Sequence, residues 1–233
     1  MTQHTPRALS LNALQKCVFT CMIYACKEYI SYIHFQKFRG VHLSAVNPIK
    51  DEKKIKLMKL VLRDQSRRGQ GTRNLLLFVM GINTALRISD LLSLTVGDVR
   101  NEKGKIRDSV RLSEKKTGKM KEFYINDSVR KVLREYLRSD MDNTEPLFPS
   151  RKGWKALTPV QAYRILTAAA ESIGLEKIGT HTLRKTFGYH IYKQTNNLGL
   201  VQKLLNHSSS GDTLRYIGLE QETLDDAYRR LNL

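Results

Sequence analysis

A small set of side chains along this chain could cleave a phosphodiester without a metal ion. They stand in short motifs: Arg87 in TALR, Lys116 in KKTGK, His181 and Arg184 in HTLR, His207 in LLNHSS, and Tyr216 in DTLRYIG. Guanidinium groups can grip the non-bridging oxygens of a phosphate and neutralise charge that develops in the transition state. A tyrosine hydroxyl can attack phosphorus, a lysine can protonate the leaving oxygen, and histidines can move protons or donate to the phosphate.

Each member of this set has an ordinary alternative when it is taken alone. An arginine at a helix start, such as Arg87, is usually a surface charge or an ion-pair partner. Lys116 in a turn is usually solvated, and Tyr216 near apolar neighbours could be a half-buried core tyrosine. His181 and Arg184 share a helix face because they are three residues apart, and they could be a solvated pair, while His207 could cap a helix. The whole set favours phosphodiester transfer.

The elements that would position these residues are predicted to be mostly helical. Two alternating segments, 109–114 and 121–126, flank the Gly-containing turn KKTGKM and predict a β-hairpin. Apolar spacing and capping residues, among them Thr158 before Pro159, predict helices elsewhere. These helices span 51–65, 74–84, 87–94, 127–140, 158–174, 180–195, 198–207 and 211–219. The predicted fold class is mainly α with a small antiparallel β-sheet.

The charge of the chain predicts a nucleic-acid partner. Forty Lys and Arg against 22 Asp and Glu give a formal net charge of +18, and the pI is near 9.9. Such an excess usually indicates a polyanionic ligand, and double-stranded DNA is the expected partner. The hairpin is especially basic, so we expect DNA-phosphate contacts from it, with a solvated basic hairpin as the alternative. The expected contacts are Arg111, Lys115, Lys119 and Lys121.

Other functional classes find little support in the sequence. The cysteines, Cys17, Cys21 and Cys26, all lie near the amino end, which argues against a disulfide framework and fits a reducing cytoplasm. No carboxylate or His/Cys cluster has a good metal-ligand pattern, so we expect no metal and no cofactor. No apolar run reaches the length of a membrane span, and residues 18–26 only weakly imitate a signal segment. The predicted location is the cytoplasm, at the nucleoid.

In this order and spacing, the motifs resemble those of the tyrosine recombinases, the phage lambda integrase family. The resemblance covers about residues 46–233, and it includes the strand–KTG–strand hairpin. It implies a tyrosine recombinase catalytic-domain fold and strand cleavage through a covalent 3′-phosphotyrosine. By this resemblance Arg87 and Arg184 clamp the phosphate, His207 donates to it, Lys116 is the general acid, His181 is a general base or phosphate ligand, Tyr216 is the nucleophile, and Asp90 supports Arg87. Lys115 is a second choice for the general acid, and we favour the residue directly before Thr-Gly.

The chain departs from the family pattern in a few places. The family often has glycine where this chain has Ala85 and Asn206. Asn206 tolerates a left-handed backbone, and Ala85 can be accommodated if its φ is negative. Residues 1–45 are too few for the usual core-binding domain, so we expect a short form: an N-terminal extension of uncertain structure over 1–45 and a catalytic domain over 46–233.

The function predicted by the resemblance is site-specific recombination, of integrase or invertase type. Alternatives are a DNA-binding accessory or regulatory protein of the same fold without turnover, and a topoisomerase of the same chemistry. Apolar residues share one side of the final segment: Leu224, Ala227, Tyr228 and Leu231. In the family such a segment docks on a neighbouring protomer, so we expect a homo-tetramer on DNA, with packing on its own core as the alternative.

Overall fold

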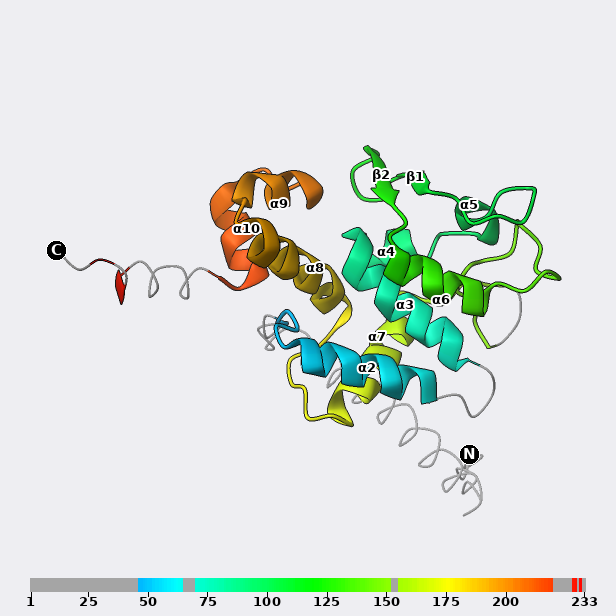
Figure 1. Ribbon diagram of the computed structural model, residues 1–233, viewed down its shortest axis with the longest axis horizontal. Coiled ribbons are helices and arrows are strands. Elements are labelled where there is room, and N and C mark those ends of the chain that lie inside the picture. The colour runs from blue at the N-terminus through cyan, green and yellow to red at the C-terminus, as the bar shows by residue number, and fades with distance from the viewer. Residues whose placement is uncertain (1–45, 65–69, 152–154, 220–227, 230, 232–233) are drawn as a thin grey trace, which may run out of the picture. The chain divides into compact units, whose positions relative to one another are not determined.

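The computed structural model describes residues 46–64, 70–151, 155–219, 228–229 and 231 (Figure 1). The expected extension over 1–45 lies outside these residues, so the domain boundary at 45 stays a prediction. The elements in chain order are α2 (Glu52–Asp64), α3 (Gly71–Thr84), α4 (Ile88–Leu91), α5 (Val96–Val99), β1 (Ser109–Ser113), β2 (Met120–Tyr124), α6 (Asp127–Tyr136), α7 (Pro159–Glu171), α8 (Thr180–Thr195), α9 (Leu198–Leu204) and α10 (Ser210–Ile217). The predicted fold class is confirmed.

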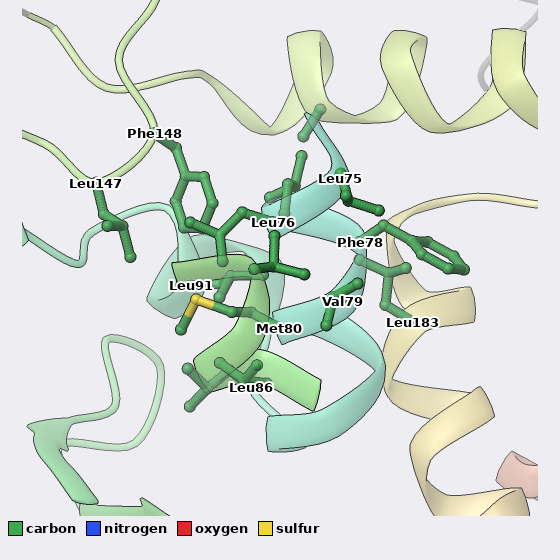
Figure 2. Packing of buried hydrophobic residues seen from close by; sticks show 14 of the residues in the cluster. Leu75, Leu76, Phe78, Val79, Met80, Leu86, Leu91, Leu147, Phe148 and Leu183 are labelled. Atoms are coloured by element: carbon green, nitrogen blue, oxygen red, sulfur yellow. The ribbon is translucent and has the colours of Figure 1, made fainter. Parts of the chain in front are cut away.

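Helix α3 forms the centre of the main hydrophobic core. Its segment Leu75–Met80 is almost entirely buried, as a helix that is apolar on every face must be. Helices α2, α6 and α8 pack around it (Figure 1), and Figure 2 shows Leu183 of α8 beside the α3 side chains. Helix α2 contributes Met58 and Leu62, which are fully buried. A Cβ added to Gly81 would lie 2.4 Å from the Leu183 side chain, so a small residue lets α3 and α8 approach closely. This approach brings the end of α3 beside Arg184.

The two-stranded sheet has the predicted antiparallel register. Val110 pairs with Phe123, and both side chains are buried, whereas Arg111 and Tyr124 are exposed. This alternation follows from the two-residue period of a strand. Ile125, just after β2, is fully buried and anchors the hairpin to the core. This anchor fixes the position of the turn between the strands, which carries Lys116.

A second, smaller core joins α8, α9 and α10. Besides Ala85 at the end of α3, it consists of buried residues from all three helices and their flanks: Tyr189, Val201, Leu205, Ile217 and Leu219. Gly188 of α8 makes this packing possible, because a Cβ there would lie 2.7 Å from Ile217 Cγ2 and 3.2 Å from Leu205 Cδ1. The glycine that ends the HTLRKTFG motif therefore fixes the position of the helix that carries Tyr216.

The helix predicted over 87–94 is shorter than expected. Helix α4 ends at Leu91, because the chain then leaves to bond with the segment before α7: the Leu94 carbonyl accepts from Leu147 N at 2.8 Å. The chain then turns into α5, a helix that was not predicted, through a capping box between Thr95 and Asp98. These pairings are between distant segments, so local periodicity could not reveal them. The predicted cap of α7 at Thr158 is confirmed, with its hydroxyl accepting from Gln161 N.

Candidate active site

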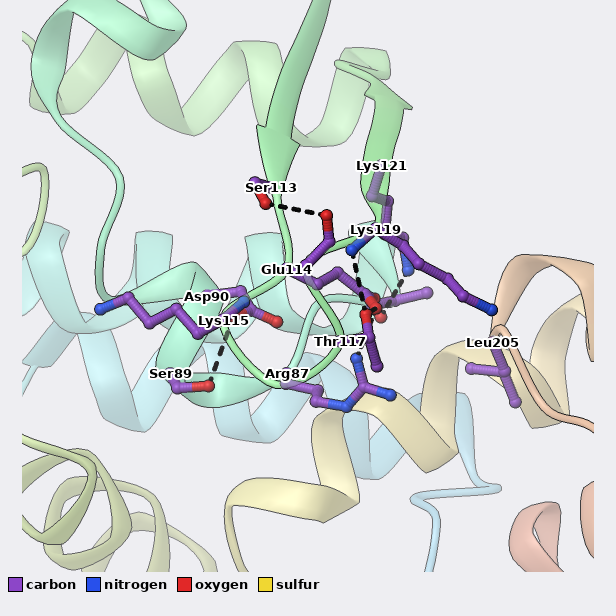
Figure 3. Close-up of polar contacts among 12 residues, drawn as sticks. Arg87, Ser89, Asp90, Ser113, Glu114, Lys115, Thr117, Lys119, Lys121 and Leu205 are labelled. Carbon is purple, nitrogen blue, oxygen red and sulfur yellow. Dashed lines mark hydrogen bonds and ion pairs between the residues drawn. The ribbon is translucent and has the colours of Figure 1, made fainter.

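The predicted catalytic residues converge where four segments meet. These segments are the α3–α4 junction, the β1–β2 hairpin, the first turns of α8 and the α9–α10 turn with α10 (Figure 1). Arg87 follows the end of α3, and Figure 3 shows it beside the hairpin turn. His181 and Arg184 lie on α8, His207 lies between α9 and α10, and Tyr216 lies on α10. Residues more than a hundred positions apart thus form one cationic site.

Arg184 is the buried centre of this site. Its residue exposure is 3%, and its guanidinium donates one hydrogen bond to the Ala85 carbonyl and another to the Leu205 carbonyl. Burial lowers the pKa of Arg184, although the nearby Tyr216 opposes that change. A guanidinium has five N–H donors, so these two bonds leave others for a phosphate. Arg184 therefore ties the end of α3 to the end of α9 and stays available for an anion.

The backbone at Ala85 does not meet the condition of a negative φ. Its φ is +54°, and Ala85 is the left-handed C-cap of α3. That conformation costs about 1–2 kcal/mol for an alanine. It turns the Ala85 carbonyl towards the site, where it accepts from both Arg184 and Lys121. Asn206 has a φ of +50°, which is the left-handed geometry that asparagine tolerates.

The Tyr216 hydroxyl is placed as a buried nucleophile would be. It makes no hydrogen bond of good geometry with the residues that the structure describes, although the Arg184 guanidinium lies close enough to interact with it. Burial raises the pKa of Tyr216, and the positive charge of Arg184 acts in the opposite direction. The His207 ring meets the Tyr216 ring edge-on at a centroid distance of 4.8 Å, and Lys185 Nζ lies 5.2 Å from the centre of the tyrosine ring. The positive charges of Arg184 and Arg87 therefore offset part of the effect of burial, and the phenol stays protonated until a base accepts its proton.

The two site histidines sit in a positive field. Desolvation lowers the pKa of His181, and the charges of Arg184 and Lys185 lower it further. Desolvation also lowers the pKa of His207, again with help from Arg184. Both rings are therefore biased towards the neutral form while no anion occupies the site. A bound phosphate would reverse this bias because it would offset the neighbouring cations.

Arg87 is paired with a carboxylate that the sequence reasoning missed. Arg87 Nη1 lies 2.8 Å from Glu114 Oε2, and the Glu114 side chain is fully buried. The sequence did contain a signal for this inward position: Glu114 directly follows β1 and continues the alternation of Val110 and Leu112, whose side chains face inward. Asp90, expected to support Arg87, is also fully buried, and its Oδ1 accepts from Lys115 N at 3.0 Å (Figure 3). In the described structure Asp90 thus contacts the hairpin, and Glu114 contacts Arg87.

The basic residues of the hairpin divide into two groups. Lys115, Lys116 and Lys119 are exposed on the turn, and Arg111 is exposed on β1, where it pairs with Glu122. Lys116 is close enough for its charge to lower the pKa of His181.

Lys121, on β2, is instead half-buried inside the site (Figure 3). Its Nζ donates to the Ala85 carbonyl at 2.9 Å and to the Leu204 carbonyl at 3.1 Å. Desolvation, aided by the charge of Arg184, lowers the pKa of Lys121 to about 8. The hairpin therefore places the Lys121 ammonium against the carbonyls of Ala85 and Leu204, while the Lys116 side chain stays exposed on the turn.

Two features are absent from the residues that the structure describes. Within them, no group of three His, Cys, Asp or Glu side chains could hold a metal ion. No helix in the same residues is long and apolar enough to cross a membrane. In the final segment, Tyr228 and Leu231 are exposed, whereas Leu224 and Ala227 lie outside the described residues.

Comparison with known proteins identifies relatives of this chain. Residues 51–223 match the model of the phage integrase family. The chain is 44% identical over 184 residues to the probable integrase/recombinase YoeC of Bacillus subtilis (strain 168), covering 79% of this chain and 96% of YoeC. It is 30% identical over 185 residues to the tyrosine recombinase XerA of Pyrococcus furiosus, of which it covers 61%. The chain thus spans nearly all of one relative and less than two thirds of another.

Solved structures show the same fold. The crystal structure of XerA recombinase matches with a TM-score of 0.60 at 19% identity, over 82% of this chain and 66% of that one. The catalytic domain of bacteriophage HP1 integrase matches with a TM-score of 0.50 at 20% identity, over 79% of this chain and 95% of that one. The fold is therefore that of a tyrosine recombinase catalytic domain. With the family model matched over most of its length, this chain belongs to the phage integrase family.

Proposed function

We propose that this protein is a site-specific DNA recombinase that cuts and rejoins DNA through a covalent 3′-phosphotyrosine on Tyr216. The observation that carries the proposal is the buried Tyr216 hydroxyl, which makes no hydrogen bond of good geometry with the described residues and is flanked by Arg184 and His207. The similarity to YoeC, a probable integrase/recombinase, supports the same class of reaction. The site is built of cations and a phenol, so the proposed chemistry needs neither a metal ion nor a cofactor.

In the proposed cleavage step, Tyr216 Oη bonds to the scissile phosphorus and the bond from phosphorus to the 5′ oxygen breaks. The Tyr216 proton passes to His181, which is biased towards the neutral form and can accept it. Lys116 gives a proton to the departing 5′ oxygen. Religation is the reverse: a 5′ hydroxyl attacks the phosphotyrosine, whose bond stores the energy of the broken one.

The arginines and His207 stabilise the transition state in this proposal. Arg87 and Arg184 bind the non-bridging oxygens, on which negative charge develops. Their guanidiniums come from two different elements, the α3–α4 junction and α8. His207 donates to the same phosphate from the α9–α10 turn. Because Arg184 is already fixed by two carbonyls, little reorganisation is needed when the phosphate binds.

We also propose the surfaces that hold DNA and other protomers. Lys115, Lys119 and Arg111 are exposed on the hairpin, where they can reach backbone phosphates, and Lys121 would contact DNA from within the site. Double-stranded DNA at the nucleoid, in the cytoplasm, is the proposed partner. The exposed Tyr228 and Leu231 suit docking of the final segment on a neighbour, and the proposed assembly is a homo-tetramer on DNA.

A covalent trap tests the reaction. Purified protein is mixed with supercoiled plasmid that carries the DNA flanking its own gene, the mixture is denatured, and protein attached to DNA is detected and its site mapped. We expect an adduct from the wild type and from Tyr163→Phe, whose residue is exposed on α7, and none from Tyr216→Phe. An adduct that survives in Tyr216→Phe would contradict the assignment of the nucleophile. Relaxation of plasmids without any preferred site would instead indicate a topoisomerase.

Arg184 gives a second test of the same proposal. Arg184→Lys keeps a positive charge but loses the planar fork, so we expect cleavage to fall by at least about 100-fold. DNA binding, measured by gel shift, should fall far less because the hairpin cations remain. Equal losses of cleavage and binding in a folded variant would argue against a role in the transition state.

A further inference from the structure

Glu114 is an anion inside a site made of cations. Its residue exposure is 1%, and Arg87 and Lys121 lie close enough to act on its carboxylate. Desolvation works to raise the pKa of the Glu114 carboxyl, but the hydrogen bond from Thr117 and the charge of Arg87 outweigh it and lower the pKa. The group is therefore ionised at neutral pH. A buried negative charge beside a phosphate site opposes substrate binding, so its contacts must supply a compensating benefit.

One oxygen of Glu114 joins two parts of the site. Oε2 lies 2.8 Å from Arg87 Nη1 and accepts a hydrogen bond from Thr117 Oγ1 at 2.7 Å. Arg87 belongs to the α3–α4 junction, and Thr117 directly follows Lys116 in the hairpin turn (Figure 3). A single carboxylate oxygen thus connects the first phosphate-gripping arginine to the residue next to the proposed general acid.

The turn that carries Lys116 is closed on Glu114 by its backbone as well. Glu114 N donates to the Lys119 carbonyl at 2.9 Å, and Gly118 N donates to the Glu114 carbonyl at 2.8 Å. A second carboxylate, Asp90, holds Lys115 N at 3.0 Å. Lys115 and Thr117, on either side of Lys116, are therefore fixed to carboxylates, while the Lys116 side chain remains exposed. These bonds fix the backbone of the turn, while the exposed Lys116 side chain can change rotamer to reach a substrate.

We propose that Glu114 is a positioning residue that couples the Arg87 guanidinium to the turn 114–119, so that phosphate binding by Arg87 brings the Lys116 ammonium to the departing 5′ oxygen. This inference rests on the proposed function. It assigns Glu114 an effect on proton donation, beyond any effect on folding. The effect is specific, because it should vanish when the leaving group needs no proton.

The test compares two versions of one substrate, a synthetic duplex with the site mapped by the covalent trap. One version has the natural 5′ oxygen at the scissile phosphate, and the other has a bridging sulfur there. A thiolate leaves readily without protonation, so the sulfur duplex bypasses the general acid. Thr117→Val keeps the side-chain shape and removes the hydroxyl, which donates to Glu114 at 2.7 Å and accepts a longer bond from Lys119 N at 3.4 Å. Glu114→Gln keeps the shape but removes the charge, and Lys116→Ala is the benchmark for loss of the acid itself.

We expect Thr117→Val and Glu114→Gln to slow cleavage of the oxygen duplex by about 10- to 100-fold, below the roughly 10²–10⁴-fold of a lost general acid. On the sulfur duplex both should cleave within about threefold of the wild type, since no proton is then required. The matched control is Glu122→Gln, which removes the same charge from an exposed position on β2. It should cleave both duplexes like the wild type.

Four results would overturn the inference, and the last would overturn the proposed function as well. Equal losses on both duplexes, at unchanged thermal stability, would mean that Glu114 acts only through Arg87 or the fold. Faster cleavage and tighter DNA binding by Glu114→Gln would make the carboxylate a competitor for Arg87. If the wild type cleaves and the Glu114 and Thr117 variants cleave both duplexes at the wild-type rate, this inference alone is wrong. If the wild type cleaves neither duplex, the proposed function is wrong together with it.

Discussion

The His207 Nδ1 atom lies 3.2 Å from the hydroxyl oxygen of Thr213, one turn into α10. Thr213 Oγ1 donates its only hydrogen to the Ser209 carbonyl, at 2.8 Å. The hydroxyl must therefore accept from His207, which places a hydrogen on Nδ1 and leaves Nε2 to face the site. His207 can then donate from Nε2 to a phosphate only as the imidazolium. The Thr213 residue is fully buried, so this arrangement is protected from water.

Loss of the Thr213 hydroxyl should therefore weaken catalysis through the orientation of His207. Thr213→Val keeps the volume but removes the acceptor, and we expect cleavage to fall by about 10-fold because the imidazole loses the bond that fixes its orientation. Thr213→Ser should retain most of the activity. Covalent-adduct rates for the two variants check this. Equal rates for Thr213→Val and the wild type would contradict the orienting role.

Gly188 should not accept a larger residue. A Cβ at Gly188 would lie 2.7 Å from Ile217 Cγ2, next to Tyr216, so Gly188→Ala must push α8 and α10 apart. We expect a loss of about 1–3 kcal/mol in the free energy of unfolding and a larger fractional loss of cleavage. Gly199→Ala is the control, because the nearest atom to its Cβ is 3.5 Å away. Urea unfolding of both variants measures the difference, and equal stability would contradict the close-packing argument.

The half-buried ammonium of Lys121 should make stability depend on pH. Its pKa is lowered in the folded state from 10.5 to about 8, so between pH 8 and 10.5 the unfolded chain binds more protons and folded-state stability rises with pH. Lys121→Met has no ammonium at this position and therefore lacks this pH-dependent contribution to stability. We expect the free energy of unfolding of the wild type, relative to Lys121→Met, to increase by on the order of 1–2 kcal/mol between pH 7 and 9.5. A difference that is constant or falls with pH would show that Lys121 is not buried as described.

The left-handed backbone at Asn206 should limit what this position accepts. Asn206 lies between Leu205, whose carbonyl binds Arg184, and His207, and its φ is +50°. Asn206→Gly fits this φ without strain and should change cleavage little. Asn206→Val should cost about 1–2 kcal/mol of stability and reduce cleavage, because a β-branched residue resists this region. If Asn206→Val matches Asn206→Gly in unfolding and adduct assays, the left-handed turn is not required.

The exposed lysines of the hairpin should affect DNA affinity uniformly across sequences. Each lost phosphate contact lowers the slope of log affinity against log salt by about 0.9. Lys119→Ala should therefore bind DNA more weakly at low salt and show a slope smaller by about one unit. Arg138→Ala, at an exposed arginine paired with Asp140 outside the hairpin, is the control. Gel shifts at several salt concentrations check this, and identical slopes for the wild type and Lys119→Ala would exclude the contact.

Much of the fold followed from local pattern. The bounds of α8 agree with the predicted 180–195, and α2, α7 and the hairpin differ from their predicted ranges by a few residues at most ends. These elements carry strong period, capping or turn signals that act within a few residues. The early end of α4 and the presence of α5 could not be predicted, because both depend on pairing with residues 143–147.

The sequence by itself determined which residue types and motifs the site contains, because five motifs in order specify a chemistry without coordinates. Only the tertiary structure decided how they are held. It placed the Glu114 carboxylate on Arg87, the Lys121 ammonium on the carbonyls of Ala85 and Leu204, and Ala85 itself in a left-handed turn. These contacts join segments up to 99 residues apart, as between Arg184 and Ala85, and burial fixes them, since a buried charge or carbonyl must find whatever partner the packing brings near.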